Sequence, residues 1–351
     1  MLRLVNRSPL VFAYLSLFLA GLLTSTAMHA TAQYQPALTI EVPGFDKYNG
    51  AVAFSPDGRT ILTGGSELAL WDILTGSCLK RCPDNAVSRS LLFSPNGEIV
   101  AAAYPHQHSS EVCIKIWDLQ RGDVLFMPCY SMDIPENWES ENTWIAMAFS
   151  PDGKTLVTGD IKGSLVEWDT EIGIEKRRVT LPCGYLVQLF FLPSADRVIA
   201  SNLGASIGLY SLETGQSLYI LRGMFASLSR DGTRLLFNGD GSICLHNAAT
   251  GELIRSFPSE IVPVKQSIAL SPDGNLAIMD TASGAEEAYP LKVLDMNTGE
   301  VLRTYAVGST GLRGISPDGK YFLRAENGRL LLYDISDLQA AVKEPSVEKQ
   351  E

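Results

Sequence analysis

A tight turn of the type Ser-Pro-Asp-Gly follows a short apolar stretch seven times along this chain of 351 residues. The copies recur about every 40 residues, and they begin at Ser55, Ser94, Ser150, Leu192, Ser229, Ser271 and Ser316. A repeat of this length that is built from short strands is typical of a ring of four-stranded sheets, with one sheet per repeat. The sequence therefore predicts an all-β chain that folds as a seven-bladed β-propeller.

The first repeat shows how we expect each blade to form. Residues 51–54 are short and apolar, as in a strand buried near the axis of the ring. In the turn at residues 55–58, Pro presets φ, the Asp side chain caps the turn, and Gly accepts the left-handed conformation. The second and third strands follow at residues 61–63 and 68–72, and a more polar outer strand follows at residues 78–81.

The seventh repeat ends after its third strand, near Ser336, and residues 337–351 are expected to form a charged tail. A blade without its outer strand would leave an open sheet edge, which folded proteins avoid. Residues 37–42, with the sequence ALTIEV, have the pattern of a strand that belongs to no blade. We predict that this strand completes the last blade and closes a propeller that spans residues 33–336.

The first 32 residues have the pattern of a signal peptide. Arg3 and Arg7 precede an uncharged apolar run over residues 10–23, and the small residues Ala30 and Ala32 offer a cleavage site before Gln33. The alternative is an uncleaved membrane anchor, but a bilayer span needs about 20 apolar residues. We expect export to the periplasm or the extracellular space, with no membrane-embedded segment after cleavage.

The net charge and the cysteines constrain partners and covalent links. A formal net charge of −11 disfavours binding to nucleic acid or anionic lipid, because both are bound through basic patches. The six cysteines are Cys78, Cys82, Cys113, Cys129, Cys183 and Cys244. If Trp117 pairs with Val124 across the turn at residues 120–122, Cys113 and Cys129 come close on neighbouring strands. A disulfide between these two is therefore a possible link.

Three repeats end their third strand with a Trp-Asp pair, at Trp71-Asp72, Trp117-Asp118 and Trp168-Asp169. Together with the Ser-Pro-Asp-Gly turns, these pairs make the chain resemble the WD40-repeat family from about residue 37 to residue 336. That family often places Gly-His before the first strand, where the His joins a buried hydrogen-bond network, and this chain contains no Gly-His. The resemblance implies a divergent, exported, bacterial WD40-like propeller, and it transfers no function of a particular subfamily.

Long insertions interrupt the repeats at residues 104–111, 128–142 and 281–290. Each lies between the second and third strands of a blade or between two blades, so all three should open on the face opposite the Ser-Pro-Asp-Gly turns. Long loops on a rigid scaffold commonly carry binding. The candidate partner-binding residues are Tyr104, His106, His108, Tyr130, Asp133, Glu136, Trp138, Glu139, Glu141, Glu286, Glu287 and Tyr289.

The insertion at residues 128–142 combines acids with aromatic rings and contains no Lys or Arg. Such a segment can anchor a basic protein surface or stack on a sugar ring, and the alternative is a solvated loop without a partner. Glu286, Glu287 and Tyr289 could extend this acidic surface, or they could lie across the ring. His106 and His108 with Glu111 are a weak zinc pattern, since an irregular loop rarely holds this ligand spacing.

The chain contains no Gly-x-Ser-x-Gly elbow, no phosphate loop and no His-Glu-x-x-His helix. His246 is expected to be a packed or surface residue of a strand and not a general base, so we predict no catalytic residue, no metal and no cofactor. The sequence favours a non-enzymatic protein-interaction scaffold that binds through the inserted loops. The alternatives are a hydrolase or lactonase that acts at the central channel, where a carboxylate pair could lie, and a carbohydrate-binding or cell-wall-binding protein.

Overall fold

A computed structural model describes residues 34–43, 45, 50–64, 67–82, 90–105, 111–126, 129–131, 145–239, 241–257, 268–280, 290–305 and 311–343. The predicted signal peptide lies outside these residues. The chain divides into two units, residues 1–34 and 35–351, and every described strand and helix belongs to the second. Among the described residues, no helix has both the length and the apolar character that a membrane span needs.

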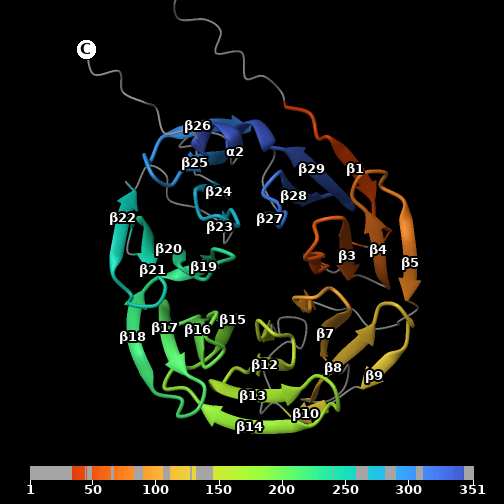
Figure 1. Cartoon of the computed structure of the whole chain (residues 1–351), viewed down its shortest axis with the longest axis vertical. Coiled ribbons are helices and arrows are strands. Elements are labelled where there is room, and N and C mark those ends of the chain that lie inside the picture. The colour runs from red at the N-terminus through yellow and green to blue at the C-terminus, as the bar shows by residue number, and fades with distance from the viewer. Residues whose placement is uncertain are drawn as a thin grey trace, which may run out of the picture. The chain divides into compact units, whose positions relative to one another are not determined.

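The second unit is a ring of seven antiparallel sheets, and Figure 1 looks down its axis. Each sheet is one blade, and its first strand lies innermost. The first strands are β2 (Val52–Phe54), β6 (Ser90–Phe93), β11 (Ala146–Phe149), β15 (Leu186–Phe191), β19 (Met224–Leu228), β23 (Ile268–Leu270) and β27 (Leu312–Ile315). The second strands are β3 (Thr60–Gly64), β7 (Ile99–Pro105), β12 (Thr155–Gly159), β16 (Arg197–Asn202), β20 (Arg234–Asn238), β24 (Leu276–Asp280) and β28 (Tyr321–Glu326).

The third and outer strands complete each blade toward the rim. The third strands are β4 (Leu68–Asp72), β8 (Glu111–Asp118), β13 (Ser164–Asp169), β17 (Ser206–Ser211), β21 (Ile243–Asn247), β25 (Leu291–Asp295) and β29 (Arg329–Asp334). The outer strands are β5 (Cys78–Cys82), β9 (Val124–Phe126) with β10 (Cys129–Ser131), β14 (Glu175–Thr180), β18 (Ser217–Arg222), β22 (Leu253–Phe257), β26 (Val301–Tyr305) and β1 (Leu38–Glu41). The seven-bladed propeller that the sequence predicts is therefore confirmed.

The N-terminal strand closes the ring, as the sequence predicts. Strand β1 pairs antiparallel with β29, with Ile40 opposite Leu330, and so supplies the outer strand of blade seven. Ile40 is 3% exposed and packs in a cluster with Trp71 of blade one and Leu323 of blade seven. One strand thus joins the first and last blades, which makes the ring continuous.

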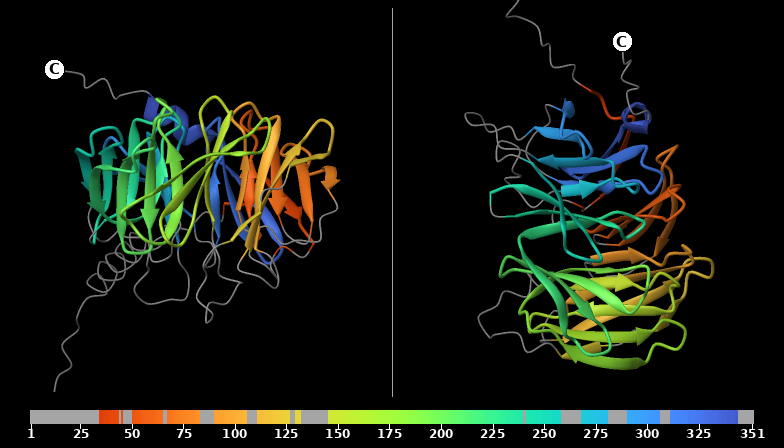
Figure 2. Two further views of the ribbon diagram at one scale, coloured as in Figure 1. Left: turned by 90° about the horizontal axis from the view of Figure 1, so that it is seen from below. Right: turned by 60° about the vertical axis from the view of Figure 1, so that its left-hand side comes forward.

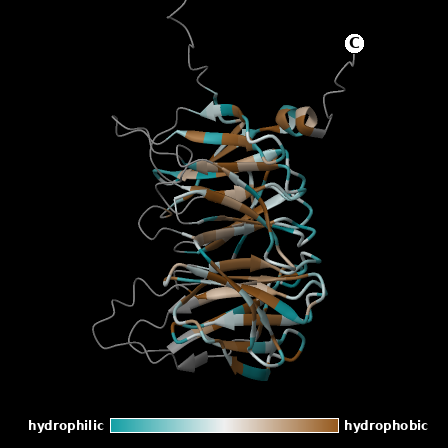
Figure 3. Ribbon diagram, turned by 90° about the vertical axis from the view of Figure 1, so that its left-hand side faces the viewer, coloured by the Kyte–Doolittle hydropathy of each residue, from teal (hydrophilic) through white to brown (hydrophobic). Residues whose placement is uncertain are grey.

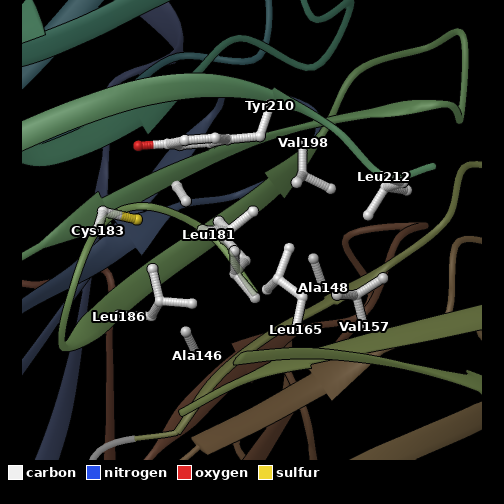
Figure 4. Close-up of a cluster of buried hydrophobic side chains, with 12 residues drawn as sticks. Ala146, Ala148, Val157, Leu165, Leu181, Cys183, Leu186, Val198, Tyr210 and Leu212 are labelled. Carbon is white, nitrogen blue, oxygen red and sulfur yellow. The ribbon is translucent and has the colours of Figure 1, made fainter. Parts of the chain in front are cut away.

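Hydrophobic clusters fill the space between neighbouring blades, so the core is a circle of seven interfaces. Figure 3 shows the apolar residues along the strands and the polar ones mainly at the turns. The interface between blades three and four, for example, packs Val157 and Leu165 against Val198 and Tyr210 (Figure 4). The outer strands β14, β18 and β22 are largely exposed; β14 is polar, whereas β18 and β22 also expose apolar side chains such as Ile220 and Leu253.

In six of the seven blades, a buried serine hydroxyl holds the turn between the first and second strands, and in blade four Leu192 stands in its place. In blade one, the Ser55 hydroxyl donates to Oδ1 of Asp57 (2.6 Å) and accepts the backbone N–H of Thr60 (2.9 Å). Oδ1 of Asp57 also accepts the N–H of Arg59 (3.0 Å). The hydroxyl makes the same two kinds of bond at Ser94, Ser150, Ser229, Ser271 and Ser316, where Asn96 replaces the Asp in blade two.

The turns of neighbouring blades also touch one another. A Cβ added at Gly97 would lie 3.5 Å from Pro56 in the preceding turn, and one at Gly153 would lie 3.5 Å from Pro95. The contact between Gly58 and Pro317 (3.8 Å) continues this series across the closure. These glycines have φ between 70° and 75°, so a side chain there would strain the backbone, while its Cβ would only make ordinary van der Waals contact with the neighbouring turn.

The Trp-Asp pairs have a packing role and a capping role. Trp71 and Trp168 are 5% exposed, and each indole N–H donates to a buried threonine hydroxyl of the second strand, Thr63 (2.9 Å) or Thr158 (3.0 Å). The Asp that follows caps the next turn, since Oδ1 of Asp72 accepts the N–H of Thr75 at 2.8 Å. The indole and threonine therefore form a buried polar pair in blades that lack the Gly-His motif.

The expected charged tail begins with a helix. Residues Ser336–Lys343 form α2, which lies at the face of the ring that carries the serine turns (Figure 2, left). Ile335 and Leu338 are buried against blades six and seven, and Asp337 pairs with Arg303 (2.5 Å). This helix differs from the expected charged tail, because the sequence SDLQAAVK has too few apolar residues to indicate that it packs against the core.

The turn carboxylates make stability depend on acid pH. Hydrogen bonds from Ser55 and Ser150 hold the pKa values of Asp57 and Asp152 below the ordinary range, and the backbone N–H of Thr75 does the same for Asp72. Because these pKa values are lower in the folded state, ionised carboxylates stabilise the fold above about pH 4, and this stabilisation is lost as the pH falls through the folded pKa values.

We expect the free energy of unfolding to fall steeply below about pH 4, where these carboxylates become protonated. Urea unfolding between pH 7 and pH 2.5 measures this fall. Asp152→Asn keeps the acceptor, as Asn96 does in blade two, and should make the fall shallower. An unchanged slope in Asp152→Asn would show that the turn carboxylates do not set the acid sensitivity.

Candidate functional site

The connections between strands separate the ring into two faces. The turn face carries the connections from first to second strand and from third to outer strand. The insertion face carries the connections from second to third strand and from each outer strand to the next blade. The described strands that flank residues 106–110, 132–144 and 281–289 end at the insertion face, which is the side that the sequence predicts for these segments.

Few of the predicted site residues lie within the part of the chain that the structure describes. Tyr104 lies on β7 and Tyr130 on β10, where the backbone gives their register. The residues outside the described part are His106, His108, Asp133, Glu136, Trp138, Glu139, Glu141, Glu286, Glu287 and Tyr289. For these residues, the structure describes only the strands that precede and follow the segments in which they lie.

The backbone brings the two insertions of blade two together. Strand β10 pairs with the start of β8, with Tyr130 opposite Val112 and Ser131 opposite Glu111. Residues 106–110 end at Glu111 and residues 132–144 begin after Ser131, so the two segments meet the described chain at adjacent points. The outer strand of blade two is therefore split into β9 and β10, which both pair with β8.

The insertion of blade six begins elsewhere on the ring. It joins β24 to β25, and blades seven and one separate blade six from blade two. Glu286, Glu287 and Tyr289 therefore do not start from the same place as the insertions of blade two. The sequence left open whether these residues extend the acidic surface of blade two or lie across the ring from it. The order of the blades favours a position across the ring.

Residues 132–144 connect the rim of the ring to its axis. They follow the outer strand β10 of blade two and precede Ile145, which leads into the innermost strand of blade three. The carbonyl of Ile145 accepts a hydrogen bond from the Ser90 hydroxyl on the innermost strand of blade two (2.8 Å). The acidic and aromatic segment is thus attached at both ends, at the rim and beside the axis.

Cys113 is disulfide-bonded, and its cross-strand neighbours are Tyr104 on one side and Cys129 on the other. Cys78, Cys183 and Cys244 are free thiols. The backbone register therefore favours Cys129 as the partner of Cys113. Such a bond would fix β10 to β8 where the 132–144 segment begins.

On the insertion face, connections of blades three and four bring together Ile161, Tyr185 and Leu203, an apolar strip that sequence reasoning missed. The N–H of Tyr185 donates to the carbonyl of Ile161 (2.8 Å), and the N–H of Leu203 donates to the carbonyl of Tyr185 (3.1 Å). These bonds hold together the connections between β12 and β13, between β14 and β15, and between β16 and β17. The Leu203 side chain is 50% exposed. A leucine in the tight turn between β16 and β17 is the sequence signal that could have indicated this strip.

The described residues contain no arrangement suited to catalysis. No cluster of three or more His, Cys, Asp or Glu side chains among them could hold a metal ion. His246 is 8% exposed, packs on Phe237, and has Nδ1 2.8 Å from the carbonyl of Gly251, so it is a core residue as expected. Burial raises the pKa of the Cys183 thiol, which faces Tyr210 in the cluster of Figure 4, and so disfavours the reactive thiolate.

Comparison with known proteins finds a match to the family "WD domain, G-beta repeat" over residues 137–169. The matched repeat begins at the acidic and aromatic segment and ends at Trp168-Asp169 of blade three. The chain is thus a seven-bladed β-propeller with a recognised WD repeat in blade three.

Several curated proteins are similar to parts of the chain. Small ribosomal subunit protein RACK1y of Oryza sativa is 32% identical over 134 residues, 37% of each chain. RACK1 of Drosophila melanogaster is 29% identical over 131 residues, 37% of this chain and 39% of the fly protein. Periodic tryptophan protein 2 homolog of Schizosaccharomyces pombe is 21% identical over 330 residues, 86% of this chain and 34% of the yeast protein.

The chain spans less than two fifths of the length of each of these three relatives. All three come from eukaryotes, so they give no support to the expectation of a divergent bacterial propeller, which stays a prediction. The fold and the repeat match support the WD40 resemblance itself.

Peptide mapping without reduction should find the Cys113 peptide linked to the Cys129 peptide, because the register places these residues directly opposite each other. Proteolysis after alkylation of free thiols, followed by mass spectrometry, measures the link. With alkylation in denaturant, Cys78, Cys183 and Cys244 should all be alkylated and serve as internal controls. A link from Cys113 to Cys82 would contradict the register argument.

Proposed function

We propose that this protein is a non-enzymatic scaffold that binds another protein at the insertion face, centred on the two insertions of blade two. The observation that carries the proposal is the pairing of β10 with β8, which brings both insertions to one place. Residues 132–144 follow β10 at the rim and precede β11 beside the axis, so the positions of both ends of this segment are fixed by the ring. A rigid ring that presents irregular segments on one face is suited to recognition.

The chemistry of the insertion suggests a partner with a basic surface. Residues 128–142 contain Asp133, Glu136, Glu139 and Glu141 with no Lys or Arg, and Tyr130 and Trp138 are interleaved. Aromatic side chains commonly supply anchors in interfaces, and complementary charge speeds association. The apolar strip with Leu203 lies on the same face of the ring and offers apolar area to a partner bound there. Because the net charge is −11, nucleic acid remains a disfavoured partner.

The relatives support a role in assemblies, since two of the three compared are named as small ribosomal subunit proteins. Against a hydrolase, the described innermost strands contain no Asp, Glu or His that could form a catalytic pair beside the axis. Carbohydrate binding through Trp138 and Tyr130 is the alternative with the same site. It predicts that aromatic substitutions weaken binding while substitutions of the acids do not.

We further propose that the protein is exported. The support is the charge and hydropathy pattern of residues 1–32 and the disulfide of Cys113, a bond that persists in oxidising compartments.

Export with cleavage should leave Gln33 as the N-terminal residue of the protein isolated from its native cells. Mass spectrometry of the intact protein and of its N-terminal peptide measures this directly. Detection of residues 1–32 in the mature protein would contradict cleavage.

The combined substitutions Trp138→Ala and Glu139→Ala should reduce capture of the partner from native extract at least tenfold, because they remove an aromatic anchor and a charge. The melting temperature should not change. Ile172→Ala is the matched control, since Ile172 is 62% exposed on the turn face of blade three. Equal capture by the double variant and the wild type would contradict the proposed site.

A further inference from the structure

The innermost strands carry a single ionisable side chain among their described residues. Their sequences are apolar or neutral in blades one to six, and blade seven contributes Arg313 on β27. Figure 1 shows β27 beside the axis of the ring, together with β23 and β19. In a chain with a net charge of −11, this places an isolated positive charge on the innermost wall.

The guanidinium of Arg313 has no carboxylate partner within ion-pair distance among the described residues. The guanidinium makes a cation–π contact with the ring of Phe45, and the ring centre lies 5.8 Å from Cζ of Arg313. Phe45 is 1% exposed, whereas the Arg313 side chain is exposed to solvent. Protein atoms nevertheless surround the guanidinium, and this desolvation lowers the pKa of Arg313. A cation that is partly desolvated and uncompensated is costly, so it favours an anion close by.

A β-bulge sets the position of Arg313. The pairing of β27 with β28 shifts from Leu312 opposite Arg324 to Gly314 opposite Leu323, which leaves Arg313 without a partner in the ladder. Bulges redirect a side chain and occur often beside functional sites. The bulge lies at the start of β27, where the chain enters from the insertion face.

Blades four and five carry bulges at the equivalent place. The extra residues are Val187 on β15 and Phe225 on β19. Phe225 has φ of 53°, a left-handed conformation that is unfavourable for a bulky residue. Three innermost strands therefore offer one extra residue each at the same end of the ring, and two of these residues are apolar. Strain of this kind is commonly retained where it serves a site.

We propose that Arg313 is the cationic centre of a site for an oxyanion, a carboxylate or a phosphate, at the end of the axis that opens on the insertion face. The planar guanidinium can donate two parallel N–H bonds to two oxygens of such a group. Phe45 lies against the guanidinium, and Phe225 and Val187 are apolar bulge residues at the same end of the innermost strands of blades five and four. The site lies apart from the insertions of blade two and does not depend on their proposed partner.

The test compares the wild type with Arg313→Gln and with the control Arg59→Gln. Arg59 is an exposed residue of the turn face, so its substitution changes the net charge equally on the opposite side of the ring. Melting temperatures are measured with increasing sodium phosphate or sodium acetate, against sodium chloride at the same ionic strength. The phosphate and acetate series distinguish the two kinds of oxyanion.

We expect phosphate or acetate to raise the melting temperature of the wild type and of Arg59→Gln beyond the effect of chloride. Arg313→Gln should lose this extra rise and should melt in chloride at or above the wild-type temperature, because it removes a partly desolvated cation that has no carboxylate partner among the described residues. Arg313→Lys keeps the charge without the planar fork and should bind the same oxyanion at least tenfold more weakly. Equal responses of the wild type and Arg313→Gln to both oxyanions, or a lower melting temperature of Arg313→Gln in chloride, would overturn the proposal.

Discussion

The buried serine hydroxyl that holds the turn between the first and second strands in six of the seven blades is the interaction on which the rest of the ring depends. It joins the turn to the start of the second strand and orients the carboxylate or amide that caps the turn. Since neighbouring turns also touch through proline and glycine, these hydrogen bonds fix how one blade follows another. The connections on the turn face are therefore similar in length and conformation. The long connections between strands occur on the insertion face.

Much of the fold could be predicted because its signals are local and repeated. The turns gave the number of blades, and a strand without a blade at residues 37–42 indicated the closure that β1 makes with β29. Helix α2 could not be predicted in this way. Its residue Leu338 and the preceding Ile335 pack against apolar residues of blades six and seven, a tertiary contact that no local sequence pattern reveals.

The candidate site was predictable only in part. The side of the ring followed from the order of strands, but the meeting of the two insertions of blade two depends on the split of its outer strand into β9 and β10. The apolar strip at Leu203 depends on hydrogen bonds between connections of different blades. Arg313 has no sequence signal at all. Its significance comes from a bulge and from the absence of other charges on the neighbouring described strands.

The central claim is that the insertion face, and not the turn face, meets the partner. Photo-crosslinking in native cells tests it most directly, with a benzoylphenylalanine in place of Trp138 or of Leu74, which is 78% exposed on the turn face. The account predicts a discrete protein adduct from position 138 and none from position 74. An adduct from position 74 with none from position 138 would contradict it.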